Sequence, residues 1–253
     1  AVSSASAALH LSCIALGLKK NDFLWTVPNT FVASATCGLH CSAKIDFVDI
    51  NEDDHNISID ELEKKLKIAK KKGKLPKVLV AVHFSGLPVN QEKIHILSKQ
   101  YGFKILEDAS HALGAKYKKE KVGSCKWSDM TVFSFHPVKP ITTAEGGIIT
   151  TNNKKYFEQV AKLRTHGITK NLNDLKKKIN KKWYYEFQNL GFNYRMSEIH
   201  AALGISQLDK LNKFLIKRNK LALRYFKKLK VSNFILPAID KDKYSTFHLF
   251  VIK

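Results

Sequence analysis

The chain has 253 residues, of which 44% are hydrophobic, and its formal net charge is +21. This length and apolar content allow one sizeable hydrophobic core, which excludes a disordered chain. No apolar run approaches the roughly 18 residues of a membrane span, and the first residues lack a basic-then-apolar signal segment. We therefore expect a globular protein of the cytoplasm with no membrane partner.

The positive charge is distributed in a way that does not favour nucleic-acid binding. Lysines gather in runs at residues 64–65, 70–72 and 176–178, without the interleaved aromatic residues that stack on bases. Lysine also greatly outnumbers arginine, which is typical of solvated helix faces. We predict no nucleic-acid partner, and keep a basic nucleic-acid-binding protein as an alternative.

The four cysteines are Cys13, Cys37, Cys41 and Cys125, and they contain no C-x-x-C pair of the kind found in zinc sites. His40 between Cys37 and Cys41 gives the nearest approach to a metal-binding group, but nothing nearby in the sequence supplies further ligands. We interpret the cysteines as reduced thiols of a cytosolic protein and predict no metal site.

Helix-like and strand-like segments alternate along most of the chain, which is typical of an α/β fold with a mainly parallel sheet. In chain order we predict a helix at residues 4–18, a strand at 23–27, a helix at about 30–41, strands at 45–48 and 78–84, a helix at 91–101, and strands at 103–106, 130–135 and 147–151. The strand at 103–106 presents Glu107 and Asp108 at its carboxyl end. Ligands of such folds bind at the carboxyl ends of the strands, so we expect the site there.

The last forty or so residues differ in character from the rest. A long basic helix at about 210–230 ends in a polar linker at Ser232, and residues 244–252 are strand-like. We predict a large domain at residues 1–215, followed at 216–253 by a linking helix and the start of a smaller domain. Because the chain begins at Ala1 instead of Met, leads directly into a helix and stops inside a strand-like run, we expect a fragment at both ends.

Lys139 lies between Pro137 and Pro140, in a turn between two strand-like runs. This position fixes the amine and removes it partly from water. Desolvation disfavours the ammonium form and lowers the pKa of a lysine, so the neutral amine becomes available as a nucleophile. The pattern predicts that Lys139 forms an imine with an aldehyde cofactor.

Pyridoxal phosphate (PLP) would need a carboxylate beside its pyridine nitrogen, a cradle for its phosphate and a flat side chain against its ring. Asp108 is the candidate for the carboxylate. The small residues and hydroxyls at 3–8 open a helix, where backbone N–H groups and the positive helix terminus bind phosphate. Phe31 is placed to stack on one ring face, and His111 to flank the other.

Each of these residues has a plainer explanation when it is taken alone. An aspartate at a strand end often caps the next helix, and a serine-rich helix start is usually a cap. Phe31 fits a core position, and His111 fits an ordinary hydrogen-bonded histidine. The order of these features along the chain, with Ser134 five residues before Lys139, favours a cofactor site instead.

The chain resembles the DegT/StrS family of sugar-nucleotide aminotransferases, which have the fold of aspartate aminotransferase (fold type I). The matching segments follow family order and cover nearly the whole chain: residues 3–11, 28–31, 107–115, 133–147, 163–167 and 191–199. The resemblance implies a PLP-dependent transferase with a mainly parallel central sheet flanked by helices, followed by the start of a smaller α+β domain.

The resemblance also implies the role of each site residue. Lys139 binds the cofactor and shuttles protons, Asp108 pairs with the pyridinium nitrogen, and Ser134 binds the phosphate together with Ala5 and Ser6. The family more often has Gly-Thr where this chain has Ala5-Ser6. Serine keeps the hydroxyl and alanine keeps the backbone N–H, so we expect phosphate binding to survive.

Phe31 and His111 are implied as the two neighbours of the ring, with His111 standing where the family often has glutamine. In the family an asparagine from the partner subunit completes the phosphate site, and Asn193 matches it here. An obligate homodimer with shared active sites follows from the resemblance.

The segments at 108–114 and 134–147 are most similar to the branch of the family that makes the pseudaminic acid precursor. That branch aminates C4 of a UDP-linked 4-keto-6-deoxy N-acetylhexosamine, with L-glutamate as amino donor, for surface polysaccharide or nonulosonic acid. Three alternatives stay open: a transaminase of another nucleotide sugar, a PLP-dependent sugar dehydratase and a noncatalytic regulator of the same fold. Some dehydratases replace the lysine by histidine, so Lys139 argues against that alternative.

Overall fold

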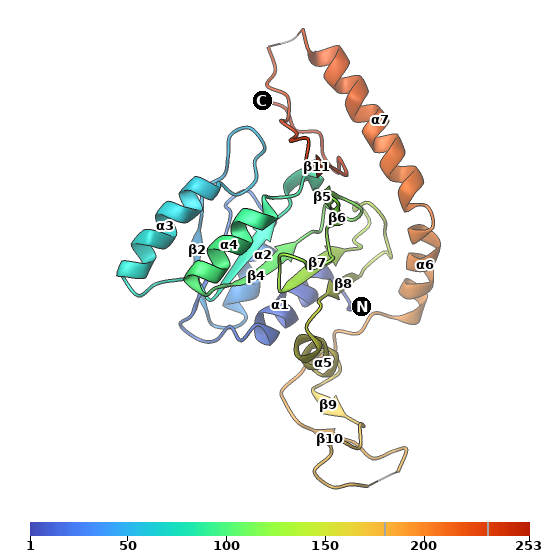
Figure 1. Ribbon diagram of the computed structural model, residues 1–253. Coiled ribbons are helices and arrows are strands. Elements are labelled where there is room, and N and C mark those ends of the chain that lie inside the picture. Colours follow the sequence, from blue (N-terminus) through green and yellow to red (C-terminus); the bar gives the residue numbers. More distant parts are fainter. Residues whose placement is uncertain (180, 232) are drawn as a thin grey trace.

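The computed structural model describes residues 1–179, 181–231 and 233–253. A six-stranded sheet in the order β2-β1-β3-β4-β7-β8 forms its centre (Figure 1). The strands are β1 (Phe23–Thr26), β2 (Lys44–Phe47), β3 (Val78–Val82), β4 (Lys104–Asp108), β7 (Met130–Ser134) and β8 (Gly147–Thr150). All neighbours pair in parallel except β8, which runs antiparallel to β7. The predicted mainly parallel sheet is confirmed.

Helices cover both faces of this sheet (Figure 1). On one face lie α1 (Ala5–Ala15), α2 (Ala33–Leu39) and α5 (Lys154–Leu163), and on the other lie α3 (Ile59–Lys71) and α4 (Gln91–Tyr101). Every residue of β3 and β7 is therefore buried. In β3 this burial matches a continuous apolar run, which is typical of a strand covered on both faces.

The helix α3 is absent from the predicted elements, although its ends carry clear signals. The Ser58 hydroxyl accepts a hydrogen bond from the backbone N–H of Glu61, and lysines occupy the last turn, where the helix dipole favours positive charge. Only Leu62, Leu66 and Ala69 are buried, and lysines separate them in the sequence.

The remaining elements lie around this core. A small three-stranded sheet contains β5 (Lys116–Tyr117), β6 (Glu120–Lys121) and β11 (Lys243–Tyr244), and the pair β9 (Ile168–Thr169) and β10 (Glu186–Phe187) projects from the molecule (Figure 1). A short 3-10 turn, η1 (Phe84–Gly86), follows β3, and α6 (Glu198–Leu208) precedes the long α7 (Leu211–Leu229). None of the described helices is long and apolar enough to cross a lipid bilayer.

The carboxyl ends of β1, β3, β4 and β7 meet at one edge of the sheet, because these strands are parallel. The connections that leave this edge are residues 27–32, 83–90, 109–115 and 135–146. The strand β4 runs to Asp108, two residues beyond its predicted end, and pairs there with Val82 of β3. This pairing fixes the backbone of Asp108 at the edge.

The prediction of a strand at residues 244–252 is wrong beyond Tyr244, where β11 ends. The backbone N–H of Thr246 donates to the Gly86 carbonyl and that of Leu249 to the Ser85 carbonyl, so this segment packs on η1 and not on a strand. Phe247 has φ of 45°, which breaks any extended ladder. Ser232, where the predicted linker begins, lies outside the described residues, and residues 233–242 form no helix or strand. The predicted domain boundary at residue 215 falls inside α7, and the domain division stays a prediction.

Because β4 lies in the hydrophobic core, removing a large side chain from it should lower the free energy of unfolding. Leu106 is fully buried in β4, so Leu106→Ala should lower the free energy of unfolding by about 2–5 kcal/mol. Ile96 of α4 is 59% exposed, and Ile96→Ala should cost less than about 0.5 kcal/mol. Chemical denaturation of the two variants checks this, and equal losses would contradict the placement of β4 in the core.

Candidate active site

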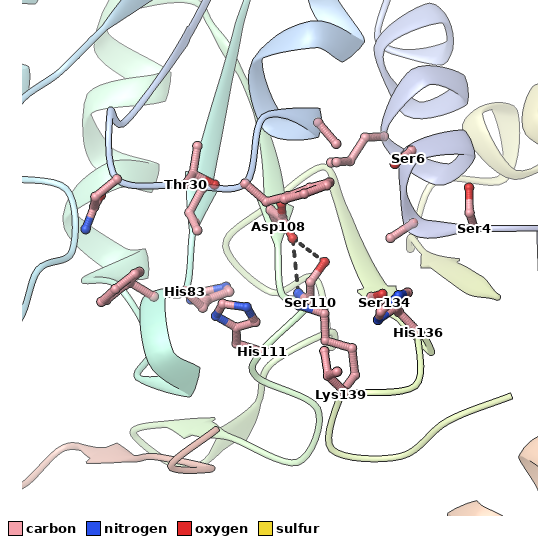
Figure 2. A pocket seen from close by; sticks show the side chains of 18 of the residues that line it. Ser4, Ser6, Thr30, His83, Asp108, Ser110, His111, Ser134, His136 and Lys139 are labelled. Carbon is pink, nitrogen blue, oxygen red and sulfur yellow. Dashed lines mark hydrogen bonds between the residues drawn. The ribbon is translucent and has the colours of Figure 1, made fainter. Parts of the chain in front are cut away.

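A cavity of about 610 Å³ opens at the carboxyl edge of the sheet (Figure 2). Its walls come from the start of α1 and from the connections after β1, β3, β4 and β7. All but one of the predicted site residues line it: Ala5, Ser6, Phe31, Asp108, His111, Ser134 and Lys139. Segments that are far apart in the sequence therefore meet in one place, as the order of the motifs predicts.

Asp108 is 6% exposed, and both of its carboxylate oxygens accept hydrogen bonds. The Ser34 hydroxyl of α2 donates to Oδ2 at 2.6 Å. The Ser110 hydroxyl and backbone N–H donate to Oδ1 at 2.6 and 3.1 Å. The alternative explanation of Asp108 as a helix cap is wrong, because residues 109–115 form turns and no helix. The carboxylate is instead held in one orientation at the cavity.

Lys139 lies in the connection between β7 and β8, as predicted. Its backbone N–H donates to the His136 carbonyl at 3.0 Å, and the Phe135 N–H donates to the Gly146 carbonyl at 2.9 Å, which closes the connection at its base. Burial lowers the pKa of Lys139, and the negative charge of Asp108 partly opposes this shift. Figure 2 shows both side chains at the same cavity.

The start of α1 has the properties of a phosphate site. The Ser4 side chain caps the helix by accepting a hydrogen bond from the Ala7 N–H at 3.1 Å, so the serine-rich start is in part a cap. Ala5 and Ser6 belong to the first turn, whose N–H groups have no partner within the helix. A Cβ on Gly147 would come within 2.7 Å of the backbone of Ser4 and Ala5, so glycine permits this close approach.

Phe31 and His111 both face the cavity, but neither is an ordinary core residue. Phe31 is 71% exposed, which makes the core explanation wrong. His111 Nδ1 is buried without a hydrogen-bond partner among the described residues. Burial and then the charge of Lys139 lower the pKa of His111 to about 4, and Asp108 opposes them. The ring is therefore neutral at neutral pH.

His83 Nε2 lies 3.8 Å from the Glu107 carboxylate, but two other buried polar atoms of the lining, Asn29 Oδ1 and His111 Nδ1, have no hydrogen-bond partner in the described part of the chain. Buried polar groups are rarely left unpaired, so these atoms mark a place for a polar ligand. An amine, an oriented carboxylate, a helix N-terminus and flat rings match the chemistry of PLP. The residues present therefore fit this cofactor.

The structure adds residues that the sequence did not single out, and it places one predicted residue elsewhere. Ser34 orients Asp108, and the Thr30 hydroxyl lies 2.9 Å from the Ser34 hydroxyl. The sequence signal that could have identified Ser34 is its position about one helical turn after the 28–31 motif. Asn193 does not line the cavity of its own chain, and its backbone pairs with Thr165 instead.

Among the described residues, no group of His, Cys, Asp or Glu side chains has the arrangement of a metal site.

Comparison with known proteins identifies the family to which the chain is similar. The model of the DegT/DnrJ/EryC1/StrS aminotransferase family matches residues 1–253. A Campylobacter jejuni protein named UDP-4-amino-4,6-dideoxy-N-acetyl-beta-L-altrosamine transaminase is 40% identical over 252 residues, which cover 99% of this chain and 63% of that protein. The chain thus spans less than two thirds of the length of the curated relatives it matches.

Solved structures agree with this match. Helicobacter pylori PseC, described as an aminotransferase involved in the biosynthesis of pseudoaminic acid, matches with a TM-score of 0.85 and 33% identity over 99% of this chain and 64% of that one. Spr1654 of Streptococcus pneumoniae in its PLP-form matches with a TM-score of 0.84 and 27% identity, over 99% of this chain and 65% of that one. The fold is the predicted α/β fold of these aminotransferases, and the chain belongs to the DegT/DnrJ/EryC1/StrS aminotransferase family.

The charges around Lys139 predict its reactivity as a function of pH. Because burial lowers its pKa, Lys139 should react with an amine-specific reagent at a lower pH than exposed Lys64, whose pKa is raised by its hydrogen bond to Glu61. Asp108→Asn removes the charge that raises the Lys139 pKa, so the midpoint should fall further. Peptide mass spectrometry after brief reductive methylation measures both midpoints. A Lys139 midpoint at or above that of Lys64 would contradict this description of the site.

Proposed function

We propose that this protein is a PLP-dependent aminotransferase that moves an amino group from L-glutamate to C4 of a nucleotide-linked 4-keto-6-deoxy sugar. The observation that carries the proposal is that Lys139 and Asp108 open on one cavity, which also contains the first turn of α1. The best-supported substrate is a UDP-linked 4-keto-6-deoxy N-acetylhexosamine, because two Campylobacter jejuni relatives that are 40% identical to this chain are named for a UDP-linked amino sugar of that kind.

When bound, PLP supplies an aldehyde that carries the amino group and an electron-poor ring that stabilises negative charge on the reacting carbon. The residues of this chain would bind PLP and orient it in the cavity. The first turn of α1, with Ala5 and Ser6, and Ser134 would bind the phosphate. Asp108, held by Ser34, would keep the ring nitrogen protonated.

Lys139 would act twice, because its amine can bind the aldehyde and, once displaced by the amino donor, can move a proton as a general base. A lowered pKa favours both roles, since both need the neutral amine. The presence of this lysine in the cavity also argues against a dehydratase that uses histidine in its place. A noncatalytic regulator would have no need for the buried hydrogen bonds of Asp108.

We propose a homodimer in which Asn193 completes the phosphate site of the partner subunit. Asn193 does not line the cavity of its own chain, and α6, which follows it, has no buried residue in any of its 11 positions. Ile199 and Ile205 of α6 are 83% and 68% exposed. Apolar side chains exposed in this way support an interface with a second copy.

A cytoplasmic location belongs to the same proposal. All four cysteines are free thiols in the structure. Free thiols fit the reducing conditions of the cytoplasm better than an oxidising compartment.

The proposal predicts that Lys139→Ala abolishes the visible absorbance change on addition of PLP and the formation of 2-oxoglutarate from L-glutamate. Lys93→Ala, on exposed α4 surface, is the matched control and should keep both. A panel of UDP- and dTDP-linked 4-keto sugars then identifies the amino acceptor. Retention of both signals by Lys139→Ala would refute the assignment.

The shared site makes a separate prediction for mixed dimers. Lys139→Ala and Asn193→Ala homodimers should each be inactive or weak, but refolding them together should restore about a quarter of wild-type activity, since half of the dimers then contain one intact site. Two different affinity tags on the variants, with purification through both tags, establish that mixed dimers have formed. Mixed dimers without restored activity would contradict sharing of Asn193.

A further inference from the structure

The segment at residues 245–249 packs behind the cavity, although it is far from the other site residues in sequence. The Thr246 hydroxyl donates to the His111 carbonyl at 2.6 Å, and the Thr246 backbone N–H donates to the Gly86 carbonyl at 3.1 Å. A Cβ on Gly86 would lie 2.8 Å from the His111 carbonyl oxygen, so the packing here leaves room only for glycine. The segment is thus attached to the connections that follow β3 and β4.

The helix α7 holds the other side of this segment. Arg218 Nη1 donates to the carbonyls of Phe247 and His248, at 3.3 Å each. Asn219 Nδ2 donates to the Ser245 carbonyl at 3.2 Å. The ring of Phe226 packs against that of Phe247, with centroids 6.1 Å apart. Contacts on both sides therefore fix the backbone that carries the His248 side chain.

The His248 ring lies on the ring of His111. Their centroids are 4.3 Å apart and the planes differ by 32°. Nδ1 of each ring is buried without a hydrogen-bond partner among the described residues. No hydrogen bond at Nδ1 sets the orientation of His111, so van der Waals contact with its neighbours must contribute to it.

We propose that His248 is a positioning residue, whose ring supports the back of the His111 ring and keeps its opposite side in place at the cavity. This inference rests on the proposed function, because that side is where the ring of PLP would pack. His248 itself does not line the cavity and acts through His111.

The charges around the pair are consistent with two stacked neutral rings. His111 faces Asp108 and Lys139, and His248 faces His111, Lys139 and Arg218. Burial first, and then His111 and the neighbouring cations, lower the pKa of His248 to about 3. Both rings therefore stay uncharged at neutral pH, where a charge on either one would be buried beside Lys139.

The test compares His248→Ala, which removes the ring, with His248→Phe, which keeps a flat ring without nitrogen. In the cofactor-free chain, nuclear magnetic resonance should show that His248→Ala shifts the His111 ring signals and raises its pKa, because water reaches the ring. His248→Phe should leave the His111 pKa close to that of the wild type. His95→Ala, in α4 and away from the cavity, is the control and should change neither.

With PLP added, His248→Ala should weaken binding about two- to tenfold and reduce the circular dichroism of the bound cofactor, whereas His248→Phe should stay within about twofold of wild type. If His248→Ala does not fold, the flexible His248→Gln takes its place. Unchanged His111 signals in His248→Ala, or equal losses in His248→Phe and His248→Ala, would overturn the proposal. If the wild-type chain binds no PLP, the proposed function fails, while the His111 signals still test the contact.

Discussion

The site depends on one buried carboxylate, that of Asp108, which is fixed across the cavity from the amine of Lys139. The sheet sets the backbone of Asp108 through pairing with β3, and two serines set its side chain. A buried negative charge is costly unless hydrogen bonds and opposite charges compensate for it. Ser34, Ser110 and the nearby lysine supply that compensation, so the charge can remain where a cationic ring nitrogen would need it.

The remaining elements of the fold can be understood as supports for this pair. Parallel strands bring their carboxyl ends to one edge, and the antiparallel β8 returns the chain so that Lys139 lies in a closed connection beside that edge. Gly147 lets the start of α1 approach β8 closely. The same small residue therefore helps to bring a helix N-terminus and a lysine to the same cavity.

Much of this arrangement could be predicted from the sequence, because strong local signals carried it. An apolar run marked β3, and the motifs placed Asp108 at the carboxyl end of a strand and Lys139 in the connection between two strands. The failures have physical causes. Lysines obscured the three buried positions of α3, and residues 246–252 have the composition of a strand although tertiary hydrogen bonds to η1 decide their conformation. The contact between His111 and His248 joins residues too distant in sequence for any local pattern to predict.

We propose that Lys139 and Asp108 hold opposite ends of one bound PLP molecule. A crystal structure of this chain grown with PLP tests it most directly. We expect continuous electron density from Lys139 Nζ to the cofactor, its ring nitrogen within hydrogen-bond distance of Asp108 and its phosphate at the first turn of α1. Cofactor bound elsewhere, or in this cavity with its ring nitrogen turned away from Asp108, would contradict the account.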